Sequence, residues 1–496
     1  MKKILISILF LPFFLVPRAY GSDIEVRLQA LEKIIQEQQN IIEKQQQEVN
    51  ELKARTGMKK AADGEKSATA STKEKESGGS LKTQVKDSVH LTTPIEQKSS
   101  EGLKALEVYS FPQGKFSPNI EFIVDGSYVG RGMNDETYRR LSVPDFIPSG
   151  SSGFRRGFNL NYGEMFLFAP VNPYFDLKAV IPFSESGVEL EEAYFRTKTL
   201  PWGLQLKAGK FRSFFGLLNE QHRHDWDFAD ASLINRAFFG EDGLVEKGVQ
   251  VNWLAPTPFY LLFGGEILQG ENTASFGTNT LSLAKNGQSF SKDSAPAPNL
   301  LLAYLKSSVN MGSFSLLGGF SYAQGQTRQN LTVDAGTQAA YGETKIYGID
   351  LTAKYSIDSY RYLSWQNEFM FRQMRLNTGY DPAPGDPTRN LAFFGKDLNQ
   401  SGFYSQLVYR FAEQWRTGIR YDLFSQNDVY VNGATQSRPG DLNRVSAMLE
   451  FRPTEFSTLR LQFNRDNSLF DGNHREPVNS IMLQFTMAIG ATAQAD

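Results

Sequence analysis

The stretch NSIMLQFTMAIG, residues 479–490, alternates apolar positions with largely polar ones. Its apolar residues occupy every second position: Ile481, Leu483, Phe485, Met487 and Ile489. Because successive side chains of a β-strand point to opposite faces, this period of two predicts a strand with one apolar and one polar face. About ten residues of such alternation are what a strand needs to cross a membrane as part of a β-barrel.

The same alternation recurs upstream in QWRTGIRYDLF (414–424), RVSAMLEFR (444–452) and TLRLQFN (458–464). Followed back to about residue 117, it predicts sixteen strands, an even number as in bacterial outer-membrane barrels. Short turns alternate with long polar links, among them 213–243, 325–342, 377–399 and 426–442. Outer-membrane barrels have short periplasmic turns and long outer loops. The sequence therefore predicts an all-β transmembrane barrel of about 16 antiparallel strands.

Composition agrees with a barrel and excludes several other classes of protein. Aromatic residues make up 13% of the 496 residues although mean hydropathy is −0.38, which is typical of strands with one apolar and one wet face. The 52 Lys and Arg balance 54 Asp and Glu, so nothing indicates a nucleic-acid partner. The absence of cysteine excludes disulfides, thiol catalysis and Cys-ligated metals. A soluble sandwich or propeller is the alternative fold, but no repeated blade motif favours it.

The sequence ahead of the barrel divides into three segments. Residues 1–21 combine two lysines, an apolar run and small residues near its end, the pattern of a secretory signal peptide. Residues 22–56 carry a heptad pattern, and residues 57–109 are a low-complexity segment that predicts a flexible linker. Residues 110–496 then form the barrel. No later apolar run is long enough for a transmembrane helix.

The heptad segment predicts a coiled coil in the periplasm, because both ends of an even-stranded barrel face that side. Positions spaced alternately by four and three residues form the seam: Ile24, Leu28, Leu31, Ile35, Gln38, Ile42, Gln45, Val49 and Leu52. Such a narrow seam favours a homo-oligomer. A single amphipathic helix lying on a periplasmic or cell-wall partner is the alternative.

The barrel region resembles the family of phosphate-selective porins O and P, most specifically in LQLKAGKFRSFFG (204–216) and in the closing strand. The resemblance implies a trimeric sixteen-stranded barrel that passes small solutes, with anion preference set by lumenal Arg and Lys. No phosphate-site residue of the family aligns to a single position here. The chain ends in GATAQAD rather than in the aromatic residue usual for these barrels.

The strand phases place a group of arginines on the inner face of the barrel, where charge sets the selectivity of a pore. These predicted pore-lining residues are Arg372, Arg410, Arg416, Arg420, Arg444 and Arg460. Asp422, Glu450 and Glu368 share that face. The alternative is that these are ordinary water-facing side chains without a selective role.

The link 213–243 is the third outer loop, and the resemblance implies that it folds inward and narrows the pore. A loop this long, with many apolar residues, is typical of a functional element. Its predicted constriction residues are Glu220, His222, Arg223, His224, Asp225, Asp227 and Asp230. With a charge near −4, the loop would face the arginine wall across the pore and create a transverse field. That charge would also moderate any anion preference.

His222 and His224 raise a metal hypothesis, because two histidines at this spacing lie on one side of an extended segment. Asp225 or Asp227 would complete a zinc-type ligand set. The alternative, which we adopt at this stage, is that the histidines hydrogen-bond the loop to the barrel wall. We therefore expect no metal and no other cofactor.

Together these patterns predict a non-enzymatic outer-membrane porin for passive diffusion of small hydrophilic solutes, anions such as phosphate among them. The expected partners are outer-membrane lipid, small ions and further copies of the chain, as a homotrimer. An outer-membrane tether or assembly protein acting through the coiled coil is the alternative. A barrel enzyme or a metal-linked transporter is less favoured, since no nucleophile motif stands beside the clustered histidines.

Overall fold

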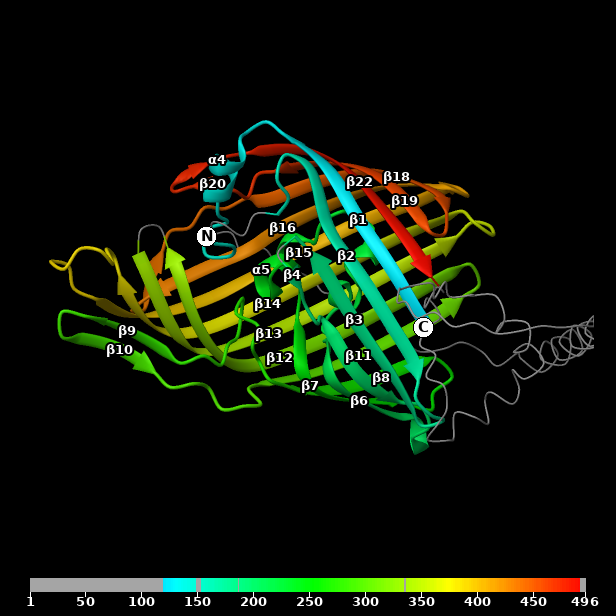
Figure 1. Cartoon of the computed structure of the whole chain (residues 1–496), viewed down its shortest axis with the longest axis horizontal. Helices are drawn as coiled ribbons and strands as arrows, with labels where there is room; N and C mark the ends of the chain where they lie inside the picture. Colours follow the sequence, from blue (N-terminus) through cyan, green and yellow to red (C-terminus); the bar gives the residue numbers. More distant parts are fainter. Residues whose placement is uncertain (1–118, 149–152, 186, 334–335, 491–496) are drawn as a thin grey trace, which may run out of the picture. The chain divides into compact units, whose positions relative to one another are not determined.

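The computed structural model describes residues 119–148, 153–185, 187–333 and 336–490 (Figure 1). The predicted signal peptide, coiled coil and linker lie outside the described residues. Within the described residues, no helix is long and apolar enough to cross a membrane.

The described elements are mostly strands, with two short α-helices and three 3₁₀ turns. In chain order they are β1 (Asn119–Arg131), α4 (Asp135–Arg140), β2 (Gly157–Pro170), β3 (Phe175–Ser184), β4 (Gly187–Val188), β5 (Glu192–Thr197), η1 (Pro201–Gly203), β6 (Leu204–Arg212), η2 (Leu218–Glu220), η3 (Arg223–Asp225), α5 (Leu233–Phe239), β7 (Val245–Leu254), β8 (Tyr260–Leu268), β9 (Leu281–Lys285), β10 (Gln288–Lys292), β11 (Leu300–Met311), β12 (Phe314–Val333), β13 (Gly336–Ser356), β14 (Tyr362–Asp381), β15 (Ala392–Ala412), β16 (Trp415–Val431), β17 (Ala434–Gln436), β18 (Leu442–Thr454), β19 (Ser457–Asp466), β20 (Phe470–Asp471), β21 (His474–Arg475) and β22 (Val478–Gly490).

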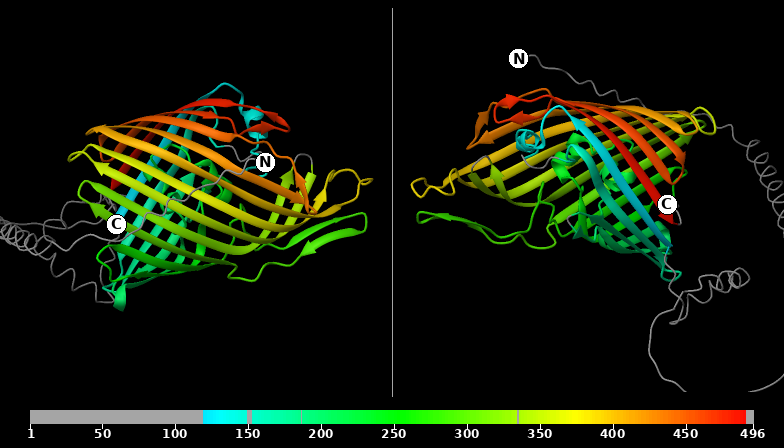
Figure 2. Two further views of the ribbon diagram at one scale, coloured as in Figure 1. Left: turned by 180° about the vertical axis from the view of Figure 1, so that it is seen from behind. Right: turned by 45° about the horizontal axis from the view of Figure 1, so that its top comes forward.

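Sixteen of the described strands form one antiparallel wall that closes on itself (Figures 1 and 2). The closing pair is β1 with β22, in register from Glu121 opposite Gly490 to Arg131 opposite Ser480. The short strands β4 and β17 pair with β3 and β16, and β9–β10 and β20–β21 are separate hairpins. Closure pairs every wall strand on both sides, which leaves no open edge. The prediction of a sixteen-stranded barrel is confirmed.

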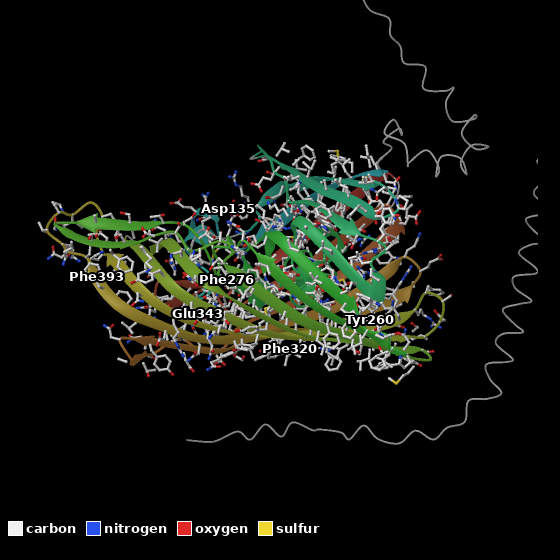
Figure 3. All side chains as sticks on the ribbon, turned by 90° about the horizontal axis from the view of Figure 1, so that it is seen from below. Asp135, Tyr260, Phe276, Phe320, Glu343 and Phe393 are labelled. Atoms are coloured by element: carbon white, nitrogen blue, oxygen red, sulfur yellow. The ribbon has the colours of Figure 1, made fainter. Side chains whose placement is uncertain are left out.

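The two faces of the wall differ in polarity as the alternation predicts. On β22, Leu483 and Phe485 are exposed on the outside, whereas Gln484 between them is buried inside. Leu461 on β19 is paired with Leu483 and is also exposed, so the apolar positions of neighbouring strands adjoin. Figure 3 shows Phe320 of β12 on this outer surface. An apolar outside around a polar inside is the reverse of a water-soluble barrel and is suited to lipid.

The wall is much taller on one side than on the other. Strands β12 to β15 have 20 or 21 residues, whereas β5 to β8 have 6 to 10. At about 3.3 Å per residue, a 20-residue strand is about 66 Å long, and tilted by about 45° it still spans about 47 Å, well beyond the roughly 30 Å of the hydrocarbon core. The long strands therefore extend past the membrane at the end that carries the long links (Figure 1).

This extension corrects the prediction of long polar loops at 325–342, 377–399 and 426–442. Most of their residues continue strands, and β12 pairs with β13 up to Val333 opposite Gly336. The physical reason is that backbone hydrogen bonds sustain a strand in water without an apolar face. The end of apolar alternation therefore marks the edge of the membrane belt and not the end of the strand.

The largest apolar cluster among the described residues lies inside the barrel. It joins residues of the segment 213–243, such as Phe215 and Phe238, to Phe146 of the segment 141–147 and to inner-wall residues such as Met370. Phe276, which Figure 3 labels, belongs to the same cluster. The lumen is thus partly filled by a packed core, and this core fixes the segment 213–243 in place.

Candidate functional site

The segment Ser213–Gly243, which we call the inner loop, connects β6 to β7 and folds into the lumen, where Figure 1 shows its helix α5. Its backbone donates hydrogen bonds to four different wall strands: Gly216 to Ser321 on β12, Leu217 to Glu368 on β14, Leu233 to Asp422 on β16 and Ala229 to Gln462 on β19. These bonds are 2.7–3.2 Å long. The inner loop therefore crosses the interior from its own wall to the opposite one.

Local sequence explains why the inner loop ends its crossing in a helix. The Ser232 hydroxyl accepts a hydrogen bond from the Asn235 backbone N–H and caps the N-terminus of α5. Gly240 ends the helix at φ 83°, a conformation that glycine adopts without strain. Between these ends, Phe238 and Phe239 are fully buried. Burying each of these rings stabilises the docked loop by about 1.5–3 kcal/mol.

Two carboxylates of the inner loop bind the predicted arginine wall directly. The Asp230 carboxylate lies 2.7 Å from Arg420 Nη2 and 2.9 Å from Arg444 Nη1. Asp227 lies 2.8 Å from Arg416 Nη1. The inner loop is therefore held to β16 and β18 by three charge-assisted contacts.

Wall carboxylates complete this network. Glu450 accepts hydrogen bonds from both Arg416, at 2.7 and 2.8 Å, and Arg460, at 2.8 and 2.9 Å. Asp422 accepts from Arg420 and Arg444, at 3.1 and 3.3 Å. Arg416, Arg420 and Arg444 thus each contact one carboxylate of the inner loop and one of the wall. Buried charged groups require such partners to offset the cost of removing them from water.

The predicted transverse field between the loop and the arginine wall is wrong. The opposite charges are in contact and not separated by a pore, so most of their fields cancel locally. The physical reason is the cost of burying charge: an arginine in a loop-filled lumen is stable only with a carboxylate against it.

The arginines Arg420 and Arg444 also keep the Asp230 carboxyl ionised. Burial by itself raises the pKa of Asp230, but the two guanidinium groups outweigh it and lower that pKa to about 2. Gln462 adds a hydrogen bond of 2.8 Å from its amide. Asp230 therefore remains charged at any pH that a bacterium normally meets.

The other two predicted wall arginines behave differently. Arg372 is buried, lies 4.3 Å from the Phe238 ring centroid and donates to Gln400 and to the Ala237 carbonyl. Arg410 lies near the short turn after β15 and donates to the Glu413 carbonyl at 3.1 Å. Arg372 thus also holds the inner loop, whereas Arg410 braces a turn.

The remaining charged residues of the inner loop have partners of their own. Glu220 is ion-paired with Lys306 of β11. Arg223 pairs with Asp242 at 2.8 Å, within the same loop. Asp225 Oδ2 lies 3.4 Å from His224 Nε2.

The two histidines contact a different part of the wall from the arginines, on β2 and β5. His222 Nε2 lies 3.2 Å from Glu192 of β5, and His224 Nδ1 lies 3.3 Å from Glu164 of β2. Asp227 cannot complete a metal set with them, because it binds Arg416 and Gln406. The segment is also not extended as expected, since Arg223–Asp225 forms a 3₁₀ turn.

Sequence reasoning missed the carboxylates on β2 and β5 and the lysine on β11. Glu164, Glu192 and Lys306 are all buried. The sequence feature that could have revealed them is a charged residue at a polar position of an alternating strand, as in NYGEMF and AYLKSS. That feature does not single these residues out, because a charged residue at an inward position says nothing of the loop residue that it meets, and Glu192 lies on a strand of only 6 residues.

Two cavities lie beside the inner loop. One, of about 630 Å³, is bounded by the loop and by β1, β2, β19 and β22. The other, of about 420 Å³, is bounded by the loop, the segment 142–148 and strands β12 to β15. Arg236 and Glu241, whose charged groups lie 2.5 Å apart, line both cavities.

The fold and this interior define the class: a closed sixteen-stranded β-barrel whose lumen holds an ion-paired, inward-folded loop. No family model matches the sequence. A protein of Aquifex aeolicus (strain VF5), described as uncharacterized, is 47% identical over 407 residues, covering 81% of this chain and 84% of the relative. The chain belongs to the family of that protein.

Solved structures with a similar chain course are barrels of the outer membrane. The outer membrane channel DcaP of Acinetobacter baumannii has 11% identity and a TM-score of 0.44, over 76% of this chain and 98% of that chain. The anion-selective porin from Comamonas acidovorans has 10% identity and a TM-score of 0.41, over 76% and 100%.

Proposed function

We propose that this protein is a passive diffusion channel of the bacterial outer membrane for small hydrophilic solutes. The observation that carries the proposal is the closed barrel with an apolar outside and a polar, charged inside. Such a wall satisfies its backbone within lipid and encloses a path lined by polar groups.

The proposed path runs beside the inner loop through the two cavities. They share the ion pair of Arg236 and Glu241, so a solute passing between them moves past this pair. Glu241 is partly exposed, which suits a group that touches the solute. The inner loop is then the constriction, and the predicted constriction residues act mainly by holding it.

The proposed selectivity is weak. The lining of the larger cavity carries five carboxylates and five arginines, the latter being Arg131, Arg155, Arg223, Arg236 and Arg444. The wall arginines Arg416, Arg420 and Arg460 are compensated by carboxylates and present little free positive charge to a solute. We propose that small anions, phosphate among them, pass with at most a modest preference.

The segments ahead of the barrel enter the proposal from their sequence. We propose a cleaved signal peptide at residues 1–21, a periplasmic coiled coil at 22–56 that joins the barrels as a homotrimer, and a flexible linker at 57–109. No enzymatic activity is proposed for the chain.

Swelling of liposomes that contain the purified protein tests the proposal. Arabinose and other small sugars should enter faster than into protein-free liposomes, and the Arg236→Ala variant should speed entry because it removes one side of the shared ion pair. Arg139→Ala, an exposed position on α4, serves as the matched control and should leave the rate unchanged. Liposomes with correctly folded protein that do not swell would refute the channel.

A further inference from the structure

A cluster of carboxylates and histidines lies on β2 and β5, apart from the arginine network on β16, β18 and β19. Glu164 of β2, Glu192 of β5 and Glu191 just before it are brought together by the intervening strand β3. Glu164 is paired with Pro182 and Glu192 with Val180, two residues apart on β3. His222 of the inner loop completes the cluster. Ligand atoms of Glu164, Glu191 and His222 all lie within 4.8 Å of one another.

The orientation of His222 is the observation that points to a ligand. Its Nε2 lies 3.2 Å from Glu192 Oε2, so the ring proton belongs on that side. Its Nδ1 is buried and, among the described residues, has no hydrogen-bond partner. The nearest carboxylate oxygen to Nδ1 is Glu164 Oε1, at 3.7 Å, which is beyond hydrogen-bond length. The residue as a whole is 7% exposed, so water does not readily satisfy this nitrogen.

This arrangement matches the way proteins prepare a histidine for a metal. A ligating imidazole usually gives its other ring N–H to a carboxylate, which fixes the ring and raises the basicity of the free nitrogen. Glu192 is placed to do this for His222, and its own Oε1 is fixed by the Arg212 backbone N–H at 2.7 Å. The free Nδ1 then faces the carboxylates of Glu164 and Glu191.

His224, two residues further along the chain, repeats the pattern. Its Nε2 lies 3.4 Å from Asp225, and its Nδ1 lies 3.3 Å from Glu164 Oε2, again without a hydrogen bond among the described residues. The two imidazole rings are nearly parallel, with centroids 5.6 Å apart, and both make T-shaped contacts with the ring of Phe166. Phe166 therefore packs against both histidines.

The charges also leave room for a cation. Glu164, Glu191 and Glu192 carry three negative charges, and Arg212, which is ion-paired with Glu191, supplies one positive charge in contact. A ligand oxygen of Glu191 lies within 4.8 Å of the ligand atoms of both Glu164 and His222. The three carboxylates thus outnumber the one guanidinium in contact with them, which suits a divalent cation.

We propose that Glu164, Glu191 and His222 bind a divalent transition-metal ion of the zinc class, with His224 as a fourth nitrogen donor and Glu192 as a positioning residue. Two carboxylates with imidazole suit Zn²⁺ or Mn²⁺ better than Ca²⁺, which takes oxygen ligands alone. Ligand atoms around zinc at about 2.1 Å lie roughly 3.4 Å apart, so the side chains need to move by only about an ångström to close on an ion. This set differs from the one the sequence indicated, because the carboxylates come from the wall.

A metal here ties the inner loop to β2 and β5, just as the arginines tie it to β16 and β18. The loop is then fixed to two separate parts of the wall. Removing the ion should free the segment around His222, while Asp227 and Asp230 keep the loop docked on β16 and β18.

Zinc binding by the full chain in detergent tests the proposal, with metal content measured by mass spectrometry after gel filtration and affinity measured by calorimetry. We expect one Zn²⁺ per chain, and ligand-field bands in the visible spectrum when Co²⁺ replaces it. Glu164→Gln and His222→Gln should lose the ion, and Glu192→Gln should weaken binding by about 10- to 100-fold. His474→Gln, at an exposed hairpin position, is the control and should bind as the unmodified chain does.

Heat-modifiable migration on gels checks that each variant is folded. If Glu164→Gln or His222→Gln fails to assemble, Glu191→Gln replaces it and should also lose the ion. A folded chain that takes up no Zn²⁺ or Mn²⁺ would overturn the proposal and leave the histidines as ion-pair partners of Glu164 and Glu192. Equal zinc content in folded His222→Gln and in the unmodified chain would also overturn it, because the ion would then lie elsewhere.

Discussion

At the scale of single residues, Asp230 is the central contact of the interior. Its two carboxylate oxygens serve two arginines from two strands, and both arginines are almost fully buried. A buried guanidinium without its carboxylate costs much more than the pair itself gains. The consequence is that a single neutral substitution in the loop disturbs the wall as well.

Asp230→Asn should therefore lower the stability of the folded barrel by on the order of 3 kcal/mol, the typical cost of removing one partner of a buried pair. Asp242→Asn is the matched control, since Asp242 is highly exposed and its pair with Arg223 is worth about 0–1 kcal/mol. The stability of each variant is measured as the temperature at which the folded band is lost on gels. Equal temperatures for the two variants would show that Asp230 does not hold the loop.

The depressed pKa of Asp230 gives a pH dependence with a definite sign. Its pKa is about 2 in the folded chain, against about 3.9 for a free aspartate, so its contribution is fully present above about pH 4 and is lost as pH falls through 2. Arg420 and Arg444 are the charged groups in contact with it; Asp422 contacts both of these arginines, and Asp466 acts on Arg444. The melting temperature should fall less between pH 4 and pH 2 in Asp230→Asn than in the unmodified chain. Equal falls in melting temperature for the two chains would contradict the role given to the Asp230 carboxylate.

At the scale of elements, the inner loop and the strands differ in how far sequence could predict them. The strand alternation was readable because lipid and lumen impose opposite polarity on alternate residues, so the sixteen strands followed from it. The partners of the loop were not readable, because Asp230 meets Arg420 and Arg444 across 190 and 214 residues of chain. Only closure of the barrel and docking of the loop bring these residues together. The alternation predicted that the Arg420 side chain points into the lumen, but it did not predict that a loop carboxylate neutralises it.

Deletion of residues 219–236 tests the inner loop as the constriction. The deletion removes η3, the first half of α5 and the rings of Trp226 and Phe228, so larger sugars should enter liposomes that exclude them with the unmodified chain. Removing 282–291 from the exposed β9–β10 hairpin is the control and should change nothing, since that hairpin lies outside the lumen core. Unchanged size exclusion in a folded loop deletion would show that the inner loop does not limit passage.

At the scale of the whole molecule, the barrel and the segments before it have separate tasks in our proposal. The barrel supplies the path, and the heptads at residues 22–56 supply association. A seam of seven apolar residues in nine positions is sufficient for a stable coiled coil.

Removing residues 22–56 should weaken the oligomer without unfolding the barrel. Semi-native gels and light scattering in mild detergent should show a trimer for the full chain and smaller species for the deletion, while heat-modifiability stays. A control deletion of equal length in the linker 57–109 should leave the trimer intact. A full-length chain that is monomeric in mild detergent would contradict this assignment.

The most direct test of the central claim is single-channel current through the purified full-length chain in a planar bilayer. A passive channel with a fixed inner loop predicts uniform conductance steps, a nearly linear current–voltage relation and a small reversal potential in a salt gradient. Steps from the 219–236 deletion should be larger by severalfold. A bilayer that holds folded protein yet shows no steps with either chain would contradict the claim that this barrel is a channel.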